Sequence, residues 1–190
     1  MKNVHGPPSL FEDHQEDEAT LIEAARANPA AFEGLYQRYV ARVYRYLRTR
    51  VGQEEDAADL TQQVFLKALN ALPSYQERGS PFAAWLFRIA RHTLTDTYRQ
   101  RRDDISWDIL PDVMIIPGRE QDPEEIILRQ ESLVRLRCLL EGVDGKKREL
   151  LALRFAAGLS TAEIALVVNK SQASVKKQLT RILSTLKEQY

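Results

Sequence analysis

The chain has little of several features that would place it quickly in a class of proteins. Its 190 residues include one cysteine, Cys138, so no disulfide can form within the chain, and we expect a small apolar core residue there. No uninterrupted apolar run approaches the roughly 18 residues of a membrane-spanning helix. The acidic N-terminal stretch also lacks the apolar core of a signal peptide. The three histidines stand without ligand spacing. We therefore expect a cytoplasmic protein without a membrane segment, metal site or cofactor.

Net charge is absent as well, because 27 Lys and Arg balance 27 Asp and Glu. Nucleic-acid-binding domains are usually basic, so this sum argues against DNA binding unless the charges are segregated. They are segregated. Residues 103–131 hold nine acids against two arginines, whereas residues 167–190 hold five bases against one acid, and residues 84–102 hold five arginines against one aspartate. A neutral total therefore leaves room for basic faces that bind nucleic acid.

Helical periodicity dominates the chain, and no segment shows a sustained strand-like alternation. Apolar residues recur at three- and four-residue steps, and Pro and Gly residues punctuate the pattern. The helices predicted in this way cover about 18–28, 32–47, 60–72, 82–98, 123–141 and 146–157, followed by two short helices after Ser160 and Ser171. These stripes would bury one another, so we predict an all-α fold.

The same pattern divides the chain into two small helical domains. Residues 103–122 contain two prolines, many acids and no sustained period, which predicts an acidic flexible linker. We expect a disordered tail over residues 1–17, a first domain over 18–102 and a second domain over 123–190.

Basic and aromatic residues alternate on the predicted helix over residues 82–98. This combination suits unstacked single-stranded bases, which bind by stacking and phosphate contact. Trp85 lies on the apolar stripe, and we expect it in the core. Phe87 lies off that stripe, and we expect it to be exposed.

The last helices have the pattern of a helix-turn-helix. Ser160 and Glu163 fit a capping box, and Asn169 suits the left-handed conformation of a tight turn. The second helix would turn an apolar stripe inward: Val175, Leu179, Ile182, Leu183 and Leu186. Its other face is polar and basic, as in a helix that enters the major groove. An ordinary helical hairpin with a solvated basic face is the alternative for this segment.

Three segments, taken together, resemble extracytoplasmic-function (ECF) sigma factors. Residues 56–68, DAADLTQQVFLKA, resemble the region 2.2 signature, and residues 82–92, FAAWLFRIARH, with the basic end at 98–102, resemble the promoter-contacting segment that follows it. Residues 159–165 and 171–181 resemble the region 4.2 helix-turn-helix. The three matches stand in the order and spacing of the family. The resemblance implies a bacterial transcription initiation subunit, which is not an enzyme, with a region 2 domain and a region 4 domain.

The resemblance also assigns contacts to residues of this chain. Contacts with core RNA polymerase at its clamp are implied for Asp56, Asp59, Leu60, Gln62, Gln63 and Phe65. Minus-ten DNA contacts are implied for Tyr75, Arg78, Ser80, Arg88, His92, Thr95, Arg99, Arg101 and Arg102. Minus-thirty-five DNA contacts are implied for Ser171, Gln172, Ser174, Lys176, Lys177 and Arg181. Other implied partners are the polymerase flap, promoter DNA in duplex and single-stranded form, and an anti-sigma factor.

Two other function classes fit the residues without the resemblance. One is a stand-alone helix-turn-helix transcriptional regulator whose N-terminal helices sense a signal or dimerise. The other is a helical scaffold or anti-regulator that does not contact DNA.

The acidic segment 103–122 generates a prediction about the free chain. Its carboxylates would oppose the approach of DNA phosphates to the basic faces. Replacing its Asp and Glu residues by Asn and Gln should raise the affinity of the free chain for duplex DNA, measured by fluorescence anisotropy at fixed salt. An unchanged affinity would contradict this prediction.

Overall fold

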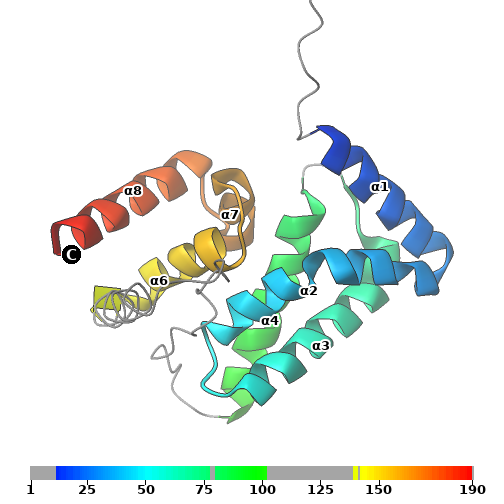
Figure 1. The fold of residues 1–190 in the computed structure, drawn as a ribbon, viewed down its shortest axis with the longest axis horizontal. Helices are drawn as coiled ribbons and strands as arrows, with labels where there is room; N and C mark the ends of the chain where they lie inside the picture. Colours follow the sequence, from blue (N-terminus) through cyan, green and yellow to red (C-terminus); the bar gives the residue numbers. More distant parts are fainter. Residues whose placement is uncertain (1–11, 78–79, 102–138, 141, 190) are drawn as a thin grey trace, which may run out of the picture.

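The computed structural model describes residues 12–77, 80–101, 139–140 and 142–189, and every regular element in them is helical (Figure 1). The long elements are α1 (Glu12–Ala27), α2 (Phe32–Arg48), α3 (Glu54–Ala71), α4 (Phe82–Arg101), α6 (Gly145–Leu151), α7 (Thr161–Val168) and α8 (Gln172–Gln189). Short segments are η1 (Pro29–Ala31), η2 (Leu72–Ser74) and the π-helical η4 (Ala152–Ala156). The all-α prediction is confirmed. The linker, Cys138 and most of the helix expected over 123–141 lie outside the described residues.

Helices α1 to α4 form the first helical unit, drawn blue to green in Figure 1. Helix α2 turns its apolar stripe inward, and Leu35, Val43 and Leu47 are completely buried. Val64 and Ala68 of α3 are buried in the same core. The first turn of α3 is acidic, which suits the positive end of the helix dipole.

Helix α1 begins earlier than its apolar pattern predicts. We expected the helix from Glu18, with residues 12–17 in a disordered tail, but the helix starts at Glu12. These added residues, EDHQED, are polar and carry no apolar stripe that packing could reveal. Their acids lie at the helix N-terminus, where negative charge is stabilised.

The second unit consists of α6, η4, α7 and α8, and its caps agree with the predictions. Ser160 and Glu163 form the capping box at the start of α7. Asn169 ends α7 in the left-handed conformation, with φ 53° and ψ 54°. Ser171 Oγ accepts a hydrogen bond from the Ser174 amide at 3.2 Å. The helix predicted over 146–157 is instead α6 followed by a π-helical turn, in which the Ala157 amide donates to the Ala152 carbonyl at 3.0 Å.

Two predictions about side-chain burial were wrong. Phe87 is completely buried, because α4 is covered on a second face and Phe87 packs edge-on against Tyr46 of α2 with ring centroids 5.6 Å apart. Leu183 is 43% exposed. It follows the buried Ile182 directly, and one residue rotates a helix by about 100°, which carries Leu183 off the inward face.

The left-handed residue of the helix-turn-helix gives a stability prediction. Asn169→Val should lower the free energy of unfolding by about 1–2 kcal/mol, because Asn tolerates this conformation and a β-branched residue does not. Asn169→Gly should cause no loss, since glycine adopts the conformation without steric cost. Urea unfolding of the two variants measures the difference, and equal stabilities would contradict the prediction.

Candidate nucleic-acid interface

Helix α4 presents four of the predicted minus-ten residues as one stripe. Arg88, His92, Thr95 and Arg99 follow one another at steps of four, three and four, which places them on one face of a helix. His92, Thr95 and Arg99 are exposed, and Arg88 is half-buried. Arg88 Nη2 donates to Ser80 Oγ at 2.7 Å, which connects this stripe to the residues before α4. The face offers positive charge and hydrogen-bond donors at separate levels along the helix.

Tyr75 does not offer its ring to a ligand. It is 3% exposed, and its ring packs against Phe82 and Trp85 with centroids 5.6 and 4.9 Å away. Burial, with a smaller contribution from the carboxylates of Glu77 and Glu18, raises the pKa of Tyr75 to about 12. The neutral phenol donates to the Ser80 carbonyl at 2.9 Å. The ring is therefore covered in this structure, and its predicted minus-ten contact stays a prediction.

The other predicted minus-ten residues are only partly described. Ser80 is half-buried beside Arg88. Arg101 belongs to the last turn of α4, and its side chain is not described. Arg78 and Arg102 lie outside the described residues.

Helix α8 separates an apolar face from a polar one. Val175, Leu179 and Ile182 are buried against the rest of the second unit. The predicted minus-thirty-five residues lie away from this core: Ser171, Gln172, Lys176, Lys177 and Arg181 are exposed, and Ser174 is half-buried. Gln178 Nε2 donates to Ser174 Oγ at 2.8 Å, so part of this face is ordered by its own hydrogen bonds. Long polar and cationic side chains near a helix N-terminus are suited to base edges and phosphates.

Helix α3 carries a third exposed stripe, and it differs from the predicted contact set. Asp59, Gln62 and Gln63 are exposed, and Asp56 is half-buried. Leu60 and Phe65 are 3% and 4% exposed, because they belong to the apolar stripe that packs on α2. In this structure they lie beneath the exposed surface of α3, and their predicted contact with polymerase stays a prediction.

Leu66 lies on the exposed face of α3 and is not among the predicted contact residues. It is 60% exposed, and with Asp59, Gln62 and Gln63 it completes the i, i+3, i+4, i+7 spacing of one helix face. The signal was present in the sequence, because Leu66 lies outside the stripe formed by Leu60, Val64 and Ala68. Single exposed apolar side chains are common on protein surfaces, so Leu66 adds apolar area to this face without marking a contact by itself.

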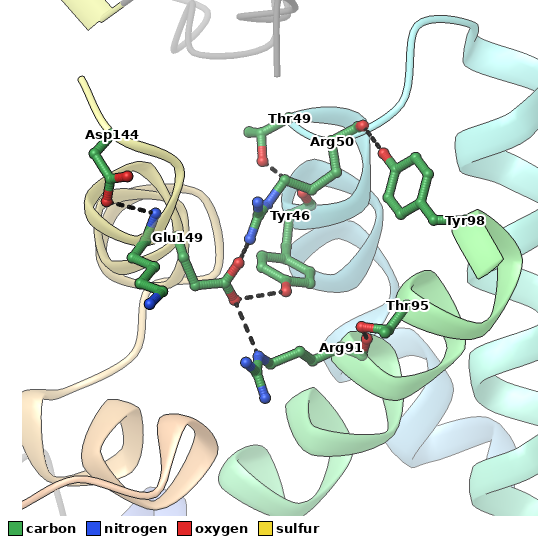
Figure 2. Close-up of polar contacts among 9 residues, drawn as sticks. Tyr46, Thr49, Arg50, Arg91, Thr95, Tyr98, Asp144 and Glu149 are labelled. Atoms are coloured by element: carbon green, nitrogen blue, oxygen red, sulfur yellow. Dashed lines mark hydrogen bonds and ion pairs between the residues drawn. The ribbon is translucent and has the colours of Figure 1, made fainter. Parts of the chain in front are cut away.

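The two units meet at Glu149 of α6 (Figure 2). Its carboxylate forms an ion pair with Arg50 and accepts a hydrogen bond from the Tyr46 hydroxyl at 2.9 Å. Arg91 of α4 lies 3.9 Å away. Arg50 is 2% exposed, and this burial lowers its pKa, so the nearby carboxylate supplies the counter-charge that water cannot supply.

Two arginines of α2 extend this junction along the end of η4. Arg42 Nε donates to the Ala157 carbonyl at 2.7 Å, and Arg42 Nη2 donates to the Gly158 carbonyl at 3.2 Å. Arg45 Nε donates to the Ala156 carbonyl at 3.2 Å. Carbonyls at a helix end have no intrahelical partner, and cations are stabilised there by the helix dipole. The junction therefore holds the residues directly before the helix-turn-helix against α2.

A cleft of about 630 Å³ lies between the units beside this junction. Thr95 of α4 lines one wall, and Lys170 of the helix-turn-helix turn lines the other. The stripe of α4 therefore borders this cleft through Thr95, whereas no residue of α8 lines it. Within the described part of the chain, no cluster of three or more His, Cys, Asp or Glu side chains is arranged to hold a metal ion. Among the described helices, none combines the length and apolar character that a membrane crossing requires.

Comparison with known proteins shows the class to which this chain belongs. Residues 35–103 match Sigma-70 region 2, and residues 133–186 match Sigma-70 region 4. The ECF RNA polymerase sigma factor SigD of Mycobacterium tuberculosis is 32% identical, over 96% of this chain and 87% of SigD. The ECF RNA polymerase sigma factor BldN of Streptomyces coelicolor is 34% identical over 87% of this chain, which spans 63% of BldN.

The fold agrees with this class. The solved structure of CnrH in complex with the cytosolic domain of CnrY has a TM-score of 0.63 and 25% identity, covering 89% of this chain and 94% of CnrH. CnrH is an RNA polymerase sigma factor of Cupriavidus metallidurans. The chain belongs to the ECF RNA polymerase sigma factors.

The junction gives a stability prediction. Glu149→Ala should lower the free energy of unfolding by about 3–5 kcal/mol, because it leaves the buried Arg50 without this counter-charge. Glu54→Ala is the matched control, since Glu54 pairs with Arg48 at 3.8 Å with its side chain 71% exposed, and should cost less than about 1 kcal/mol. Urea unfolding measures both. Equal losses in the two variants would show that the junction does not stabilise the fold.

Proposed function

We propose that this chain binds core RNA polymerase, directs it to a promoter with minus-ten and minus-thirty-five elements, and promotes melting of the DNA. The observation that carries the proposal is the presence of two separate polar faces with cationic side chains, on α4 and α8, in a chain with sigma regions 2 and 4. In this role the protein acts in the cytoplasm and catalyses no reaction itself. Polymerase performs the chemistry.

The exposed stripe of α3 is the proposed contact with the polymerase clamp. Asp59, Gln62 and Gln63 supply charge and hydrogen-bonding groups, and Leu66 supplies apolar area. Burial of a single leucine contributes about 1.5–3 kcal/mol. The polar groups around it would set the orientation of the contact.

The stripe of α4 and the polar face of α8 act on DNA in different ways. On α8, Gln172 and Ser174 would contact base edges, and Lys176, Lys177 and Arg181 would contact phosphates of duplex DNA. On α4, Arg88, His92, Thr95 and Arg99 would bind the minus-ten strand as it separates. Extruding a base from the stack costs a few kcal/mol, so binding of the polymerase must offset it.

A protein that restrains the sigma factor is a further proposed partner. CnrH was solved with the cytosolic domain of CnrY bound. Because this chain is similar to CnrH, we propose that it also binds a regulatory protein, one of the anti-sigma type.

Charge reversal on α8 tests the DNA role. Lys176→Glu with Arg181→Glu should reduce transcription from a promoter carrying the minus-thirty-five element at least about tenfold, since two phosphate contacts become repulsive. Binding to core polymerase should not change. In vitro transcription on a promoter found by mapping start sites after overexpression measures this effect, and undiminished transcription would contradict it.

Asp59→Arg with Gln63→Ala tests the polymerase role. This variant should lose capture by core polymerase in a pull-down and keep its affinity for duplex DNA. If the chain were a stand-alone regulator, its control of transcription would not depend on capture by core polymerase. Wild-type chain that core polymerase does not retain would overturn the proposed function.

A further inference from the structure

Helix α1 lies outside both sigma region matches, which begin at residue 35 and at residue 133. Its last turn nevertheless contacts the residues between α3 and α4. Arg26 Nη2 donates a hydrogen bond to the main-chain carbonyl of Tyr75, and its guanidinium carbon lies 5.7 Å from the centre of the Tyr75 ring. Arg26 thus holds the main chain and faces the ring of the same residue.

Tyr75 is connected in turn to the stripe proposed to bind minus-ten DNA. Its hydroxyl donates to the Ser80 carbonyl at 2.9 Å, and Ser80 Oγ accepts from Arg88 Nη2 at 2.7 Å. A continuous series of polar contacts therefore runs from α1 through Tyr75 and Ser80 to α4. The buried ring of Phe82 at the start of α4 packs edge-on against the Tyr75 ring, with centroids 5.6 Å apart.

The position of Arg26 is set by packing of α1 on α2. Ile22 and Ala25 are 2% and 3% exposed, and the Tyr39 hydroxyl donates to Glu18. The helices approach so closely that a Cβ atom at Gly34 would lie 2.7 Å from Leu21 Cδ2. Helix α1 is therefore held firmly enough for Arg26 to position what it touches.

We propose that Arg26 is a positioning residue for promoter melting. Helix α1 acts through it to hold Tyr75 and Ser80 in place, so that Arg88 and the rest of the α4 stripe are preorganised for the separated minus-ten strand. This inference rests on the proposed function of α4. It gives α1, through a residue outside both region matches, a part in DNA opening. This part is distinct from an effect on DNA affinity alone.

The test uses the full chain assembled with core polymerase. A promoter fragment carries 2-aminopurine in the non-template strand of its minus-ten element, and the rise in fluorescence reports strand opening. Arg26→Ala should lower the extent of opening about tenfold, the effect of losing roughly one hydrogen bond to a charged group. Capture by core polymerase and footprint protection of the minus-thirty-five element should stay unchanged.

Two variants separate positioning from stability. Arg26→Lys keeps the charge and one donor for the Tyr75 carbonyl, so it should restore most of the opening. Glu23→Ala is the matched control in the same turn, because Glu23 pairs with Arg26 with its side chain 70% exposed, and it should open like wild type. If Arg26→Ala fails to fold, Tyr75→Phe tests the next contact: it removes only the hydroxyl tie to Ser80 and should lower opening in the same direction.

The outcomes distinguish this inference from the proposed function. Wild-type holoenzyme that opens no promoter would overturn the proposed function and this inference with it. Equal opening by wild type, Arg26→Ala and Tyr75→Phe would overturn the inference alone. A loss of opening matched by an equal loss of polymerase capture would also overturn it, since it would mark a structural role. Selective loss of opening with rescue by lysine would support it.

Discussion

The two helical units share one apolar core, and at its edge a largely buried carboxylate, that of Glu149, pairs with a buried arginine. Glu149 stands between Arg50 and Tyr46 of the first unit, and Arg91 approaches from α4. Burying an arginine without a counter-charge is costly. Arg50 is buried in the fold that includes α6, and Glu149 of α6 supplies a counter-charge at the same place. The arginines Arg42 and Arg45 then bind the carbonyls at the end of η4, which sets the position of the helix-turn-helix beside α4.

This arrangement lets a chain of zero net charge present surfaces of distinct character. The stripe on α3 is acidic and polar with one exposed leucine, and the faces on α4 and α8 are basic and polar. Each face belongs to a different helix, and each is backed by an apolar stripe in the core. Binding of polymerase and of DNA can therefore be separated by substitution, because no exposed residue is shared among the three faces.

Much of the fold could be predicted from local sequence. The helix stripes, the Ser160–Glu163 capping box and left-handed Asn169 were predicted correctly, because each depends on residues within one or two turns. Long-range contacts were not. Phe87 is buried because Tyr46, about forty positions earlier, covers it, and Tyr75 is held by Arg26 from α1. No periodicity along one helix contains that information.

The helices, their caps, the segregation of charge and the resemblance to a family follow from residue type and short spacing alone. Tertiary structure decided which members of a signature point outward. Leu60 and Phe65 support α3 from the core, and Leu66 takes the exposed place on its outer face. The tertiary structure also places Glu149 between the units and brings α1 into contact with Tyr75. The physical reason is that burial and charge pairing depend on the neighbour across the interface, which chain order does not specify.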